Sequence, residues 1–126
     1  MTAQRSPKTS RLEPKDSLVE FCRSLPGATE DVKWGQDLVF SVGGKMFAVF
    51  QLPEGEPVGF KVAPPVFDDL VDRRGAVPAP YMAKHSWVSV IDRAQLPLAT
   101  LRNLLAESHR LVAEKLSKKA RQALGL

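Results

Sequence analysis

The chain has 126 residues, of which 44% are hydrophobic and 25% charged, with a formal net charge of +4 and a pI near 9.5. This length and composition predict one globular domain that needs no disulfide or metal to hold its core together. The sequence has no apolar run near the ~20 residues of a transmembrane helix, no apolar N-terminal stretch typical of a signal peptide, and a single cysteine. We therefore expect a cytoplasmic protein that does not associate with membranes.

The positive charge is concentrated at the two ends of the sequence. Residues 1–15 carry a net charge of +3 and residues 117–126 another +3, whereas residues 16–116, with 11 basic and 13 acidic residues, carry −2. We expect a flexible basic tail at 1–15, a single domain at 16–116 and a basic C-terminal tail at 117–126. Basic tails bind phosphate weakly and without sequence preference, but more often they only keep a protein soluble.

The domain is predicted to begin with a helix that Asp16 or Ser17 caps. The apolar residues of one helix face recur at i, i+3, i+4 and i+7, namely Leu18, Phe21, Cys22 and Leu25. Pro26-Gly27 ends this helix. Because Cys22 lies on the buried stripe, we expect it to be a core residue and not a reactive thiol.

The clearest local pattern in the sequence is that of a β-hairpin. Residues 38–42 and 45–52 are rich in strand-forming residues, and only Gly43-Gly44 separates them, which predicts a two-residue primed turn. The predicted register pairs Val42 with Lys45, Phe40 with Phe47, and Leu38 with Val49. The opposite face of the hairpin would then carry Val39, Ser41, Met46, Ala48 and Phe50.

The remaining elements follow in chain order. We predict a strand at 58–63, a short helix at 66–73, an irregular edge strand at 77–82, a strand at 86–91 and a long amphipathic helix at 97–116. If Val88 and Val90 face the core, Trp87 faces away from it. The order α-βββ-α-ββ-α predicts an α+β fold, a two-layer sandwich with an antiparallel sheet.

No motif in the sequence indicates an enzyme or a cofactor. Gly43-Gly44-Lys45 lacks the rest of a phosphate-binding loop, because Met46 stands where a Ser or Thr must hold magnesium. The two histidines, His85 and His109, have no neighbouring ligand at helix spacing, and we expect His109 at the surface or at its boundary. Ser108 and His109 are adjacent, so they point in different directions on a helix.

The most informative prediction concerns the second face of the sheet. It places Met46, Phe50, Lys61 and Trp87 near one another, with Lys84 and His85 just upstream. A helix, a tail or a second copy of the chain could cover this face. Aromatic residues interleaved with lysines could instead bind nucleic acid or another ligand. A wrong face assignment, or a small-molecule pocket around Trp34 and Trp87, are further alternatives.

With these elements in place, the chain resembles the YjbR/MmcQ family of small bacterial proteins from about residue 17 to residue 119. No single motif is specific, but their order and spacing are. The segments that carry the resemblance are residues 22–30, Trp34-Gly35, residues 42–48, Lys61, Pro80-Tyr81, residues 84–88, Ser108, Leu111, Val112 and Lys115-Leu116.

The resemblance implies a fold similar to that of secretion chaperones and a DNA-binding role, a label that rests on analogy with winged DNA-binding surfaces. It implies no catalytic residues. The positions that match the family's polar and aromatic signature are Trp34, Lys61, Lys84 and Trp87. Many relatives have two adjacent basic or aromatic residues before the tryptophan, whereas Ser86 stands there in this chain.

Two functions remain open at this point. The first is a non-enzymatic protein that binds DNA weakly and without sequence preference, and its candidate contacts are Lys45, Lys61, Lys84, His85, Trp87 and Trp34. The second is a homodimer or a protein-interaction module, with candidate interface residues Met46, Phe50 and Trp87. Neither function calls for a metal or another cofactor.

Overall fold

The computed structural model describes residues 16–53, 55–73, 75–80 and 82–126. The expected basic tail at 1–15 lies outside the described residues. The elements are α1 (Ser17–Ser24), β1 (Ala28–Lys33), β2 (Asp37–Val42), β3 (Lys45–Gln51), β4 (Val58–Lys61), α2 (Pro64–Arg73), β5 (Ala76–Pro78), the short 3₁₀ helix η2 (Ala83–His85), β6 (Trp87–Val90), the 3₁₀ helix η3 (Arg93–Gln95), α3 (Leu98–Glu114) and α4 (Lys118–Ala123).

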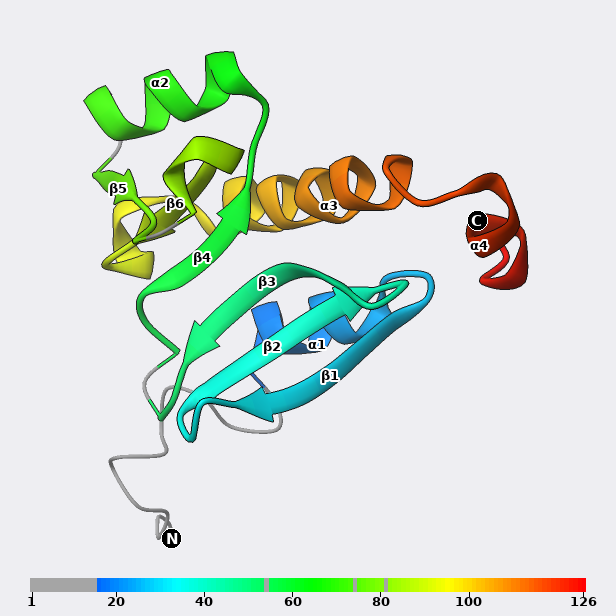
Figure 1. Ribbon diagram of the computed structural model, residues 1–126. Coiled ribbons are helices and arrows are strands. Elements are labelled where there is room, and N and C mark those ends of the chain that lie inside the picture. The colour runs from blue at the N-terminus through cyan, green and yellow to red at the C-terminus, as the bar shows by residue number, and fades with distance from the viewer. Residues whose placement is uncertain (1–15, 54, 74, 81) are drawn as a thin grey trace, which may run out of the picture.

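The strands form one six-stranded antiparallel sheet in the order β1-β2-β3-β4-β6-β5. Helices α1 and α3 lie against one face of this sheet, and α2 packs beside β5 and β6 (Figure 1). The core between the layers is built on the four buried rings Phe40, Phe47, Phe50 and Phe60. The predicted α+β class and antiparallel sheet are confirmed.

Helix α1 begins at the expected cap. The Asp16 carboxylate accepts hydrogen bonds from the N–H groups of Leu18 and Val19 at 3.0 and 3.2 Å, and it also pairs with both terminal nitrogens of Arg93 at 2.9 and 3.0 Å. Cys22 is fully buried, as predicted, and this burial raises the pKa of its thiol to about 12.

The predicted register of the hairpin is wrong beyond its first two pairs. Val42 pairs with Lys45 and Ser41 with Met46, but Phe40 then pairs with Ala48 because a β-bulge shifts the register. A bulge places two residues against one, so Phe47 and Ala48 are both buried in the core. The residues of β3 after the bulge, Ala48, Val49 and Phe50, therefore change faces relative to the prediction.

The bulge moves Phe50 from the second face into the core. Phe50 has no exposed surface, and its ring meets that of Phe40 edge-to-face at 5.9 Å between centroids. Val49 takes its place on the second face. The interpretation of Phe50 as an interface residue is therefore corrected, while Met46, which precedes the bulge, keeps its predicted face.

Two elements were absent from the prediction, β1 and α4. Strand β1 is an exposed edge whose sequence, ATEDVK, has no apolar alternation, and pairing with β2 defines it. Helix α4 lies within the segment 117–126 that was expected to be a tail. The Ser117 hydroxyl caps it by accepting from the Ala120 N–H at 3.0 Å, and Ala120 and Leu124 pack against the core.

Candidate functional site

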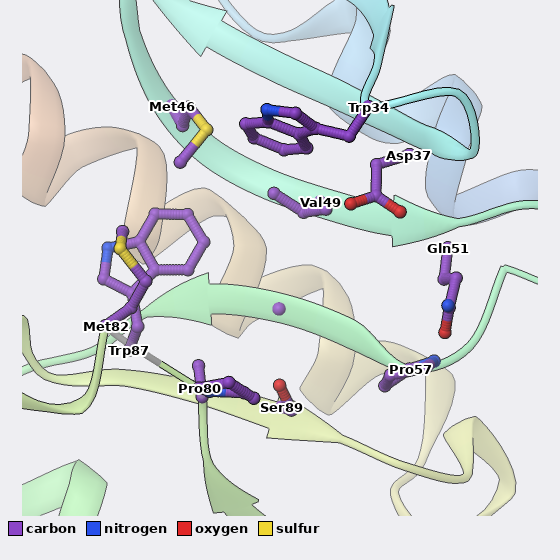
Figure 2. A pocket seen from close by; sticks show the side chains of 12 residues that line it. Trp34, Asp37, Met46, Val49, Gln51, Pro57, Pro80, Met82, Trp87 and Ser89 are labelled. Atoms are coloured by element: carbon purple, nitrogen blue, oxygen red, sulfur yellow. The ribbon is translucent and has the colours of Figure 1, made fainter.

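The face of the sheet opposite α1 and α3 carries a hollow of about 510 Å³, called here the apolar cavity. Its floor is a row of paired residues from three neighbouring strands, Val49 of β3, Gly59 of β4 and Ser89 of β6. Figure 2 shows two indoles projecting into this space, Trp34 from the β1–β2 turn and Trp87 from β6. The cavity is large enough for a flat, ring-sized ligand.

Gly59 gives the cavity its depth. A glycine inside a strand weakens the strand and often marks a place where another group approaches closely. A Cβ at this position would meet the Val88 carbonyl oxygen at 3.6 Å and the Trp87 ring at 3.8 Å, which is ordinary contact, and its backbone is not in the left-handed region. A methyl group at this position would therefore occupy part of the cavity without straining the backbone.

Trp34 is the most exposed large apolar residue among those described, with 68% of its surface open to solvent. Its φ of +54° lies in the left-handed region, which bulky side chains rarely adopt. A backbone conformation of this kind costs about 1–2 kcal/mol for a residue with a Cβ. Trp34 thus presents an exposed indole on the rim of the cavity from a strained backbone conformation.

Trp87 faces away from the core, as the sequence predicts from its neighbours Val88 and Val90. It is nevertheless only 5% exposed. The segment before β6 folds back over this edge: the Ala79 N–H donates to the Trp87 carbonyl at 3.0 Å, and the Trp87 N–H donates to the Met82 carbonyl at 3.3 Å. Trp87 thus forms a fixed wall of the cavity and is not packed under the helices.

A second hollow of about 320 Å³, called here the lysine hollow, adjoins the apolar cavity. The two share Met46, Met82 and Trp87 as a common wall. Its other lining residues within the described part of the chain are Lys45, Lys61, His85, Val112 and Lys115, and none of the described lining residues carries a carboxylate.

Lys61 lies at the centre of this positive cluster. Its ammonium group donates to the His85 carbonyl oxygen at 2.7 Å. Partial burial, and then the nearby charge of Lys115, lower the pKa of Lys61 below its ordinary value. An anion in the hollow would relieve this repulsion, because an opposite charge within a few ångströms favours the charged form of a lysine.

Most of the predicted contact residues come together here, but not all. Lys45, Lys61, His85 and Trp87 line the lysine hollow, and Trp34 lines the apolar cavity. Lys84 is exposed on η2 and lines neither hollow.

Lys115, Asp37 and Gly59 were missed as site residues. The end of α3 brings Lys115 to the hairpin tip, where Leu116 packs on Gly43, and only tertiary packing produces that contact. The glycine inside the predicted strand at 58–63 could have indicated the site, because such a glycine suggests that another group approaches the backbone closely.

The Ser108–His109 pair has a structural role. The Ser108 hydroxyl donates to the Phe47 carbonyl at 2.6 Å, while the His109 ring donates from Nε2 to the Pro26 carbonyl at 2.7 Å. The two side chains point to different partners, as the sequence predicts, although His109 is buried and not at the surface. Within the described ranges, no three His, Cys, Asp or Glu side chains are grouped as a metal site requires.

The fold and the site define a small α+β protein with helices on one face of its sheet and paired apolar and basic hollows on the other. The chain belongs to the YjbR family, which matches residues 23–111. It is similar to the crystal structure of the Deinococcus radiodurans protein DR2400, which has the domain DUF419. That similarity has a TM-score of 0.80 at 28% identity, over 94% of this chain and 92% of that chain. No curated protein matches this chain.

No helix among the described residues has the length and apolar character to span a membrane.

Proposed function

We propose that the protein binds DNA through the second face of its sheet, with backbone phosphates held in the lysine hollow. The observation that carries this proposal is the convergence of Lys45, Lys61 and Lys115 on one hollow whose described lining includes no carboxylate. Residues 16–116 have a net negative charge, so a basic hollow there is a local feature of the surface. Lysines act as point charges that bind phosphate without reading sequence.

In this proposal the protein is a cytoplasmic binding protein and not an enzyme. The basic residues at 1–15 and at 118, 119 and 121 add sequence-independent affinity. The lysine hollow differs from these residues because its three lysines lie around one concave surface of the folded domain.

The test is a fluorescence-anisotropy titration of labelled DNA with the full chain at several salt concentrations. Lys61→Gln and Lys115→Gln should each weaken binding about fivefold to tenfold and lower the slope of log affinity against log salt by about 1. Arg102→Gln is the matched control, since it removes one exposed charge from α3 outside both hollows. Equal effects of all three variants would assign the binding to net charge alone and contradict a site at the lysine hollow.

A protein-interaction module is the second candidate, and the exposed side chains Trp34 and Val32 favour it. Both lie at the β1 edge, where a second copy of the chain or another protein could dock. Light scattering at high concentration tests the homodimer form: a dimer that Trp34→Asn dissociates would support it. Phe50 is not a useful site for this test, because a polar residue there would disrupt the core.

A further inference from the structure

We infer that the apolar cavity seats an unstacked base of single-stranded nucleic acid, next to the phosphate held in the lysine hollow. This inference rests on the proposed function and specifies the class of nucleic acid. It is carried by three observations: the two hollows share a wall, the cavity floor is opened by a glycine, and a carboxylate with no partner among the described residues stands at the rim.

The occupant must combine a flat apolar body with an adjacent negative charge. Trp34 offers an exposed ring to the cavity, Trp87 forms one of its walls, and Met46 separates that cavity from the lysines on the other side. A nucleotide unit has this combination, since its base stacks on aromatic side chains while its phosphate pairs with lysine. The positive charge of the lysine hollow beside an apolar cavity therefore favours a nucleotide unit as the occupant.

The depth of the site favours single strands over duplex. In a duplex the bases are stacked and present only their edges in the grooves, so a base cannot enter a concave site unless it is extruded. A single strand can turn a base out at much lower cost. Gly59 on the floor leaves the space that such a base would occupy.

Asp37 at the rim of the apolar cavity favours bases that can donate a hydrogen bond. Its carboxylate makes no hydrogen bond or ion pair with the described residues, and Figure 2 shows it beside Trp34 and Val49. A carboxylate accepts hydrogen bonds, and the exocyclic amino group of cytosine is a donor that acidic side chains recognise. Thymine has no amino group, so the site should prefer cytosine or adenine to thymine.

The experiment measures binding of the full chain to labelled 12-nucleotide oligo-dC, oligo-dA and oligo-dT and to a duplex of the same length. We expect the single strands with amino-bearing bases to bind about tenfold more tightly than the duplex. Gly59→Ala and Gly59→Val form a graded series that fills the cavity. They should lower single-strand affinity stepwise towards the duplex value and leave duplex affinity unchanged.

Two further variants keep the test decisive if Gly59→Val does not fold. Asp37→Asn should raise affinity for oligo-dT, because it removes a negative charge, and should reduce the preference for oligo-dC over oligo-dT. Val77→Ala on β5 is the matched control, because Val77 is an exposed strand residue outside both hollows. It should change no affinity.

The outcomes separate this inference from the proposed function. Equal affinity for single strands and duplex, with no effect of the Gly59 variants, would overturn the base-binding inference and leave DNA binding through the lysines in place. No binding to any of the oligonucleotides would contradict both. A dimer that Gly59→Val dissociates would show that a second copy of the chain occupies the cavity, and would also overturn the inference.

Discussion

The hydroxyl of Ser108 accepts a hydrogen bond from the backbone N–H of Lys61 at 3.0 Å. The same hydroxyl donates to the carbonyl of Phe47, the extra residue of the bulge, at 2.6 Å. Strands β3 and β4 pair only from Ala48 and Phe60 onward, so a side chain of α3 bridges the two strands where their own pairing stops. This bridge fixes the backbone of the lysine at the centre of the lysine hollow.

Ser108→Ala should lower the free energy of unfolding by about 2–4 kcal/mol, because it leaves a buried carbonyl and a partly buried N–H without a partner. Urea denaturation followed by tryptophan fluorescence measures this loss. Ser24→Ala is the control: its hydroxyl also donates to a backbone carbonyl, that of Phe21, but at the exposed surface. We expect a change there within about 0.5 kcal/mol. Equal losses in the two variants would contradict the bridging role of Ser108.

The sequence predicts the parts of this site that depend on local pattern. The two glycines at 43 and 44 fix the turn, and alternation correctly separates Trp87 from Val88 in β6. It also places Lys61 on the same face as Trp87. These predictions succeed because turn chemistry and strand alternation act within a few residues.

Most of the errors involve contacts that are distant in sequence. The bulge, whose Phe47 carbonyl the Ser108 side chain satisfies from α3, is invisible in the hairpin's own sequence, so Phe50 was assigned to the wrong face. Strand β1 is the exception, because it pairs with the next strand in the chain and was missed for its lack of apolar alternation. Helix α4 forms where Leu124 packs near Gly27 and Val42. Lys115 joins the hollow for the same kind of reason.

The buried thiol of Cys22 should make stability depend on pH in the alkaline range. In the folded protein its pKa is raised to about 12, so the thiol stays neutral while that of the unfolded chain ionises above its ordinary pKa of 9.0. The unfolded state therefore gains stability as pH rises, and the free energy of unfolding falls by up to about 1.4 kcal/mol per pH unit between these values.

Cys22→Ala removes this dependence at the expense of a small cavity, which costs about 1 kcal/mol at neutral pH. Denaturation curves at pH 7 to 11 should therefore show the greater stability of the wild type shrinking above pH 9 and reversing near about pH 10. Curves that stay parallel over this range would contradict the raised pKa.

Trp34→Asn should separate stability from binding. Asparagine tolerates the left-handed backbone that Trp34 adopts, and the indole makes few contacts to lose because it is mostly exposed. We expect the free energy of unfolding to stay the same or rise by up to about 1 kcal/mol, while affinity for single-stranded DNA falls about fivefold to tenfold. Trp34→Val is the matched control, since it also removes the indole but keeps the strain of a β-branched residue at positive φ. It should bind as weakly as Trp34→Asn and be less stable. Unchanged affinity for single-stranded DNA in both variants would show that Trp34 does not contact the bound strand.

DNA affinity should fall as pH rises through the lowered pKa of Lys61. A bound phosphate favours the charged form of this lysine, so binding takes up a proton wherever Lys61 is partly neutral in the free protein, and by linkage the affinity declines with increasing pH. Because burial and Lys115 hold this pKa below the ordinary value of 10.5, the decline should begin at a lower pH than an ordinary lysine would give.

Lys115→Gln removes the like charge, so it should weaken binding at neutral pH but move the onset of the decline to higher pH. Anisotropy titrations between pH 7 and 9.5 at constant salt measure both effects, with Arg102→Gln as a control that should leave the onset unchanged. A pH profile that Lys115→Gln does not shift would show that Lys61 does not hold the phosphate.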